Sequence, residues 1–139
     1  MSLDGTAASP LEITYSRHSE FDLADAIRWL LQTFGEETAT HFGVRLEEEL
    51  TSLAQSIATE IAESGRYRAP VHEPASAYFA RPVYRHSVST TKKRARRSSA
   101  GLWHVYFELQ DRNRRGLPDT LIVHSIQHSA SRPYAVQTD

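Results

Sequence analysis

Hydrophobic residues in the first half of the chain recur every three or four positions, the spacing of one face of an α-helix. Ser19 can cap the first such segment, and Gly35 can end it in the left-handed conformation. A longer segment follows, with Glu36 and Glu37 near its positive end and Gly65 past its last turn. The pattern predicts an antiparallel hairpin of two amphipathic helices whose apolar seam faces another layer.

Four other segments alternate between apolar and polar residues, which is typical of β-strands. They are residues 11–16, 82–90, 102–109 and 120–128. Gly116 and Pro118 indicate a hairpin loop between the last two strands. The prolines at 70 and 74 indicate an irregular crossing from the second helix to the sheet.

The order strand, helix, helix, strand, strand, strand predicts an α+β fold. In it, an N-terminal strand and a two-helix hairpin precede a twisted, mainly antiparallel sheet of about four strands. The 139 residues suit one domain, residues 1–139. Residues 1–10 form an N-terminal extension in this prediction, and residues 70–101 form a long loop that contains one strand. Residues 129–139 are expected to be an exposed tail or a short final strand.

Strand alternation also predicts which side chains share a face of the sheet. His104 and His128 are expected on the exposed face, where they meet if the register of the two strands allows it. Trp103 falls on the opposite, apolar face and is interpreted as a core residue, and His124 is interpreted as structural. The set expected on the exposed face is His104, Tyr106, Glu108, Ile122, His124, Ile126 and His128.

Charge is divided unevenly along a chain whose formal net charge is only -1. Residues 1–65 hold 12 Asp/Glu and 3 Lys/Arg, a net of -9, whereas residues 66–139 hold 5 Asp/Glu and 13 Lys/Arg, a net of +8. Such asymmetry favours binding to nucleic acid or to an acidic protein, although the two halves can also attract each other within the fold. The absence of cysteine excludes disulfides, thiolate nucleophiles and zinc sites that need sulfur.

The positive charge is densest between the second and third predicted strands. Several cations on one short loop can contact successive phosphates of an RNA backbone, and Arg85 on the preceding strand can join them. Alternatively, the loop binds an acidic partner chain or is simply solvated. Arg112, Arg114 and Arg115 form a second cationic tip on the neighbouring hairpin. The cations of the loop are Lys92, Lys93, Arg94, Arg96 and Arg97.

The strands WHVYFEL (residues 103–109) and LIVHSIQH (residues 121–128), in this order of elements, resemble the RelE/ParE toxin superfamily of bacterial toxin-antitoxin modules. The resemblance covers residues 11 to 134. It departs from the family pattern in its greater length, mostly between residues 70 and 101, and in carrying His at some sheet positions that are usually Arg or Lys. RelE-like members cut messenger RNA on the ribosome, ParE-like members inhibit DNA gyrase, and both are silenced by an antitoxin that wraps the toxin.

Metal-free RNA cleavage requires a base for the 2′-hydroxyl, a cation for the phosphorane and a proton for the leaving oxygen. The resemblance places His104 where RelE-like nucleases carry a sheet arginine and His128 near the cation of their last strand. Tyr134 is similar in spacing to their C-terminal catalytic tyrosine, and Arg132 lies between. Histidine suits proton transfer because its ordinary pKa of about 6.5 lets it exist in either state near neutrality.

The expected function is therefore that of a type II toxin, with ribosome-dependent mRNA cleavage ahead of gyrase inhibition. A degenerate member that only binds a partner is the third alternative. The expected partners are a cognate antitoxin, the ribosome and mRNA, or gyrase; no cofactor or metal is expected, because the Asp and Glu residues show no ligand spacing. The chain has no apolar run of membrane-spanning length, and its N-terminus is unlike a signal peptide, which favours the cytoplasm.

Overall fold

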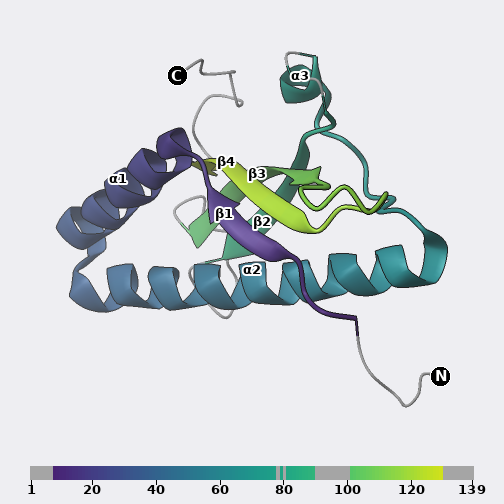
Figure 1. Cartoon of the computed structure of the whole chain (residues 1–139). Coiled ribbons are helices and arrows are strands. Elements are labelled where there is room, and N and C mark those ends of the chain that lie inside the picture. Colours follow the sequence, from purple (N-terminus) through teal and green to yellow (C-terminus); the bar gives the residue numbers. More distant parts are fainter. Residues whose placement is uncertain (1–7, 78, 80, 90–100, 130–139) are drawn as a thin grey trace.

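The computed structural model describes residues 8–77, 79, 81–89 and 101–129. Figure 1 shows a sheet with α2 running along one face, while α1 diverges from its junction with α2 and lies beside β4. The α+β architecture predicted from the sequence is confirmed, and α3 is an addition to it. The elements in chain order are β1 Glu12–Tyr15, α1 Arg17–Phe34, α2 Glu36–Ser64, α3 Glu73–Ser76, β2 Tyr84–Ser89, β3 Leu102–Gln110 and β4 Thr120–His128.

The two long helices begin and end at residues with a clear local role. Ser16 caps α1, because its hydroxyl oxygen accepts a hydrogen bond of 3.1 Å from the backbone N–H of Ser19. The prediction of Ser19 as the cap was therefore wrong; Ser19 lies buried in the first turn and donates its own hydroxyl to the Ser16 carbonyl. Gly35 and Gly65 adopt φ angles of 103° and 85° at the two helix ends, as expected of glycine.

The sheet has the strand order β1-β4-β3-β2. β1 runs parallel to β4, with Glu12 opposite Thr120, whereas the other two pairs of strands are antiparallel. The prediction of a mainly antiparallel sheet of four strands is confirmed. No described helix combines the length and the apolar character that crossing a membrane requires.

The start of α1 covers the edge of β4 where β1 stops. The Ser16 hydroxyl donates to the His124 carbonyl at 3.2 Å, and the Ser16 N–H donates to the Val123 carbonyl at 2.9 Å. One carboxylate oxygen of Asp22 accepts from both the Ser125 hydroxyl (2.6 Å) and the Ile126 N–H (2.9 Å). These contacts satisfy backbone groups that β1 is too short to reach.

The hydrophobic core lies between the two long helices and the face of the sheet that they cover. Phe42 of α2 and Phe107 of β3 are completely buried there. Trp103 is 5% exposed and packs against Phe42, with ring centroids 5.1 Å apart, which confirms its core role. Other core residues are Leu30, Leu46, Leu50, Ile57, Ile61, Val88, Val105, Leu121, Val123 and Ile126.

A β-bulge interrupts the pairing of β3 with β4. Tyr106 lies opposite Ser125, but Phe107 lies opposite Val123, so His124 is an extra residue in β4. Beyond the bulge the faces of β4 are exchanged: Ile126 joins the core, and the His128 ring lies 4.9 Å from that of Trp103. The prediction that Ile126 and His128 share the exposed face with His104 was therefore wrong.

Candidate functional site on the outer face of the sheet

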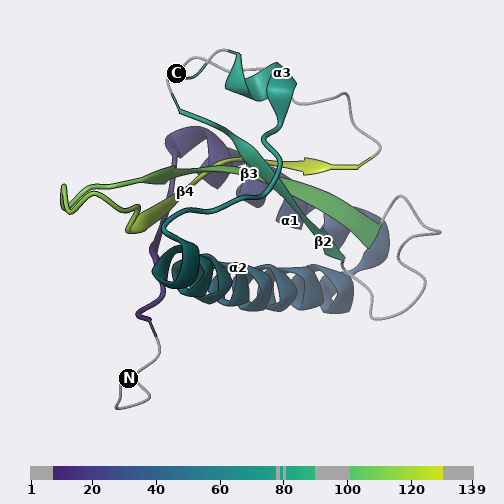
Figure 2. The same cartoon turned by 90° about the vertical axis from the view of Figure 1, so that its right-hand side faces the viewer.

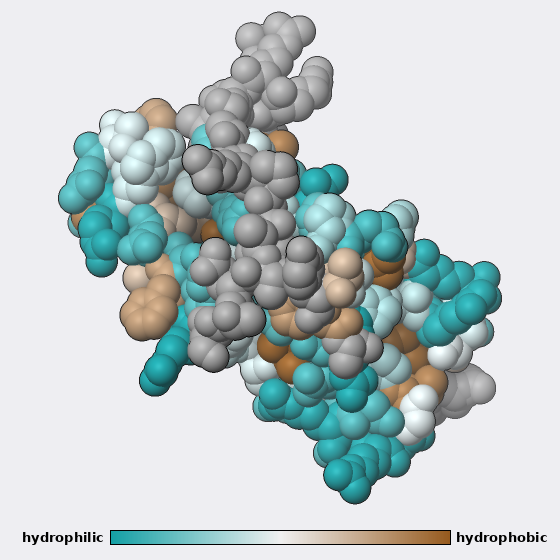
Figure 3. Space-filling view, turned by 90° about the horizontal axis from the view of Figure 1, so that it is seen from above, coloured by the Kyte–Doolittle hydropathy of each residue, from teal (hydrophilic) through white to brown (hydrophobic). Residues whose placement is uncertain are grey.

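The face of the sheet that points away from α2 carries most of the polar side chains of β2 and β3. Figure 2 shows α3 and its neighbouring segment on this side, with the sheet between them and α2. Seen from above in Figure 3, hydrophilic residues predominate at both ends of the molecule, and hydrophobic residues appear between them. We call this side the outer face.

Part of the outer face is covered by the chain that precedes β2, here called the cover segment (residues 72–77, 79 and 81–83). The Val83 N–H donates to the Ser76 hydroxyl oxygen at 2.8 Å, and the His72 N–H donates to the Val83 carbonyl, which closes the segment on itself. Ala75 and Val83 are completely buried against Tyr106. A small apolar contact therefore holds the cover segment on the middle of β3.

His104 lies on the outer face next to the end of the β2–β3 ladder. Its Nδ1 atom and the Ser87 hydroxyl are joined by a hydrogen bond of 2.9 Å, and the two residues are directly opposite each other in the sheet. Burial lowers the pKa of His104, and the positive charge of Arg85 and the neighbouring His72 and His128 lower it further. His104 is therefore a neutral imidazole at pH 7, held in one orientation by Ser87.

Arg85 and Tyr106 form the next pair of opposite residues in the ladder. Arg85 is exposed, whereas Tyr106 is only 2% exposed. Burial raises the pKa of Tyr106, and the hydrogen bond and the positive charge from Arg85 offset this only in part. The site thus presents an exposed cation, Arg85, next to a phenol that stays neutral at pH 7.

His72 belongs to the cover segment and faces the same group. Its ring lies 4.8 Å from that of Tyr106, and its Nε2 atom is buried without a hydrogen-bond partner among the described residues. Burial, and then the charge of Arg85, lower the pKa of His72. Sequence reasoning missed this residue, because it lies in an irregular segment where no periodicity indicates which way a side chain points.

A second polar group lies on the other side of Tyr106. Glu108 is 6% exposed and makes a hydrogen bond of 2.7 Å with His124 and a longer ion pair of 3.7 Å with Arg81. Burial by itself raises the pKa of Glu108, but the hydrogen bond and the charge of His124 outweigh it, so the pKa is lowered overall. The ring of Phe79 covers His124, with centroids 4.7 Å apart. The bulge at His124 makes this pairing possible, which strand alternation did not indicate.

The structure places the site residues predicted from the sequence on different sides of the sheet. His104 and Arg85 lie together on the outer face. His128 lies on the helix side, between Trp29 and Trp103. The remaining predicted residues lie outside the described ones; they are Lys92, Lys93, Arg94, Arg96, Arg97, Arg132 and Tyr134.

The outer face therefore combines neutral imidazoles, an exposed guanidinium and a neutral phenol, which together can transfer protons and stabilise an anion. Within the described residues, no three His, Asp or Glu side chains are grouped as a metal ion requires. Comparison of the chain with models of known families, with curated proteins and with solved structures found no match.

Proposed function

We propose that this chain is the toxin of a type II toxin-antitoxin module and cleaves messenger RNA on the ribosome without a metal ion. The observation that carries the proposal is the placement of neutral His104 and exposed Arg85 on adjacent positions of one face of the sheet. The element order on which the resemblance to RelE/ParE toxins rests is also present in the structure, and this supports the proposal further.

In the proposed reaction, His104 removes the proton of a ribose 2′-hydroxyl, and the resulting oxygen attacks the neighbouring phosphorus. Arg85 stabilises the negative charge of the phosphorane. The 5′-oxygen leaves with a proton, for which the proposed donor is Tyr134, and a 2′,3′-cyclic phosphate remains on the other product. His128 has no part in this scheme, because its ring packs on the helix side of the sheet.

The proposed regulator is an antitoxin with an acidic segment. Residues 66–139 carry a net charge of +8, so an acidic chain is attracted to the half that contains the outer-face site. A segment bound over Arg85 and the cations of residues 92–97 competes directly with RNA phosphates. Removal of the antitoxin then activates the toxin without any change in its fold.

Induced expression in bacterial cells tests the proposal, with growth and primer extension of a reporter message as the two measurements. Growth arrest with translation-dependent cuts is expected for the natural chain and is lost in His104→Ala and Arg85→Ala. Arg115→Ala, which removes an exposed cation of the β3–β4 loop, is the matched control and retains both effects. Growth arrest without cuts would indicate a gyrase inhibitor instead of a nuclease. Absence of growth arrest would indicate a protein that only binds a partner.

A further inference from the structure

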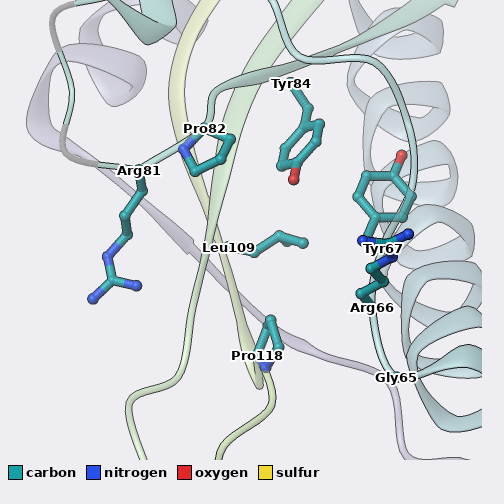
Figure 4. Close-up of a pocket in the computed structure, with 8 residues that line it drawn as sticks. All are labelled: Gly65, Arg66, Tyr67, Arg81, Pro82, Tyr84, Leu109 and Pro118. Carbon is teal, nitrogen blue, oxygen red and sulfur yellow. The ribbon is translucent and has the colours of Figure 1, made fainter.

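The two edges of the sheet are finished in different ways. β1 closes one edge with only 4 residues, and α1 covers the stretch of β4 beyond it. β2 forms the opposite edge, where no described strand pairs with its outward side. Its first residue, Tyr84, packs against Tyr67 on the helix side, with ring centroids 5.0 Å apart (Figure 4). β2 is thus a fixed strand whose outward backbone groups another chain can bind.

Both ends of the β2 edge are occupied. Before the strand, the Val83 N–H donates to the Ser76 hydroxyl oxygen, and the Val83 carbonyl accepts from the His72 N–H. At the end of the strand, Arg45 of α2 donates from Nε to the Ser89 carbonyl at 3.4 Å. None of these partners belongs to β3, so the backbone groups that they bind point outward from the sheet.

The middle of the edge is open. Alternate residues of an antiparallel strand direct their backbone groups to the same side, so Arg85 and Ser87 point outward as Val83 and Ser89 do. The outward N–H and C=O groups of Arg85 and Ser87 have no hydrogen-bond partner among the described residues. Both side chains are exposed. The opening therefore has the length of a short strand segment.

We infer that this edge binds a second copy of the chain, with the two β2 strands antiparallel about a two-fold axis at His86. In this register Arg85 of each copy lies opposite Ser87 of the other, and every outward backbone group of these residues gains a partner. The positive charge of Arg85 then lies opposite a neutral hydroxyl and not opposite the second Arg85.

Side chains beside the axis favour a second copy over an unrelated peptide. His86 lies on the helix side, where its ring makes a hydrogen bond of 3.0 Å with one oxygen of Glu49, and Arg45 lies 3.3 Å from the other oxygen. This group contains both a cation and an anion and is partly exposed, so two copies bring opposite charges close together across the axis. A peptide with charges of one sign would leave the other sign without a partner.

The inference goes beyond the proposed function. Pairing joins the two outer faces into one continuous surface that carries Arg85 and His104 of both copies. It does not require RNA cleavage, so the two proposals fail separately. A dimer that never cleaves RNA would keep this inference and remove the nuclease, and a monomer that cleaves RNA would do the reverse.

Sedimentation velocity of the full chain tests the inference. A short strand pair predicts a reversible dimer whose fraction rises with protein concentration. Ser87→Pro removes an outward N–H that the ladder with β3 does not use, and is expected to abolish the dimer while circular dichroism shows an unchanged fold. Ser87→Ala is the matched control, because it removes the same hydroxyl but keeps the N–H, and it should still form the dimer.

Three outcomes of this experiment would overturn the inference. They are a natural chain that stays monomeric up to about 1 mM, a dimer that survives Ser87→Pro, and a monomer whose β2 edge binds an extended peptide instead.

Disulfide cross-linking tests the register without a proline in the strand. The chain contains no cysteine, so His86→Cys can form a disulfide only between two copies. At the axis the two Cα atoms are expected to lie about 4.5 Å apart, within the reach of a disulfide. Ser87→Cys is the control, because its two Cα atoms would lie more than about 7 Å apart. Rapid formation of a covalent dimer by His86→Cys alone is expected, and equal cross-linking of Ser87→Cys would contradict the inferred pairing.

Discussion

The two faces of the sheet are built from the same strands but from different chemistry. On the helix side, Phe107, Val105, Leu121 and Val123 are completely buried and pack against the apolar seam of α2. On the outer face, alternate positions of the same strands carry polar groups; they are Arg85, Ser87, His104, Tyr106, Glu108 and His124.

The apolar residues on the helix side and the polar residues on the outer face therefore differ in their roles. Apolar residues of similar size would cover the outer face at a lower cost in desolvation than a buried Glu–His pair or the Nε2 atom of His72, which has no hydrogen-bond partner among the described residues. Apart from the Glu108–His124 pair, which also stabilises the fold, the polar residues of the outer face are therefore interpreted as functional, whereas the helix side contributes most of the stability. Substitutions on the two faces test this division directly.

The largest expected effect is on the helix side. Phe42→Ala removes a completely buried ring that contacts Trp103, and is expected to lower the free energy of unfolding by about 3–5 kcal/mol, from lost burial and the cavity left behind. Urea denaturation followed by tryptophan fluorescence measures it. Phe21→Ala is the matched control, because Phe21 is 63% exposed and its loss should change stability by less than about 0.5 kcal/mol. Similar losses in both variants would contradict the assigned core.

The next effect concerns the Glu108–His124 pair. Glu108→Gln replaces a buried charged acceptor by a neutral one and is expected to cost about 2 kcal/mol at pH 7. Because the pKa of Glu108 is lowered from 4.5 in the folded protein, the carboxylate stabilises the fold fully above its ordinary pKa and loses this effect as the pH falls through the folded pKa. Urea denaturation of both proteins as a function of pH should show their difference shrinking in acid. A constant difference would mean that the charge of Glu108 does not stabilise the fold.

The same contrast explains which parts of the structure could be predicted from the sequence. Helix and strand positions follow from local periodicity, so α2 was predicted to begin near Glu36 and to end before Gly65, and β4 to run from residue 120 to residue 128, close to the observed bounds. The core positions of α2, such as Phe42 and Leu50, follow from the same pattern. These properties depend on residues close together in the chain.

The outer-face site was predicted only in part, because it depends on contacts between distant segments. The bulge at His124 lies beside the hydrogen bonds from Ser125 and Ile126 to Asp22, more than one hundred residues away, and no local pattern indicates it. The pairing of Glu108 with His124 follows from that bulge. His72 reaches the site through the path of the cover segment rather than through strand alternation.

A smaller effect is expected where α1 covers the edge of β4. Asp22→Ala leaves the Ile126 N–H and the Ser125 hydroxyl without their acceptor and should cost about 1–2 kcal/mol. Amide hydrogen exchange should show faster exchange at Ile126. Asp25→Ala is the control on the same helix, since the ion pair of Asp25 with Arg28 is exposed to water. Unchanged exchange at Ile126 in Asp22→Ala would show that the β4 edge does not need α1.

The smallest expected effect on stability is that of His104→Ala. Its side chain is half-buried and its hydrogen-bond partner, Ser87, is exposed to water, so the free energy of unfolding should change by less than about 0.5 kcal/mol. RNA cleavage, in contrast, should fall by about a hundredfold or more, the usual contribution of a general base.

The pH dependence of cleavage distinguishes a base from a merely structural histidine. Because burial and Arg85 lower the pKa of His104 from 6.5, the neutral imidazole predominates at pH 6.5, and cleavage should decline as the pH falls further. His104→Ala should remove this acid limb from whatever activity remains. If His104→Ala instead unfolds as readily as Phe42→Ala, the outer face stabilises the fold just as the helix side does, and the separation of the two faces is wrong.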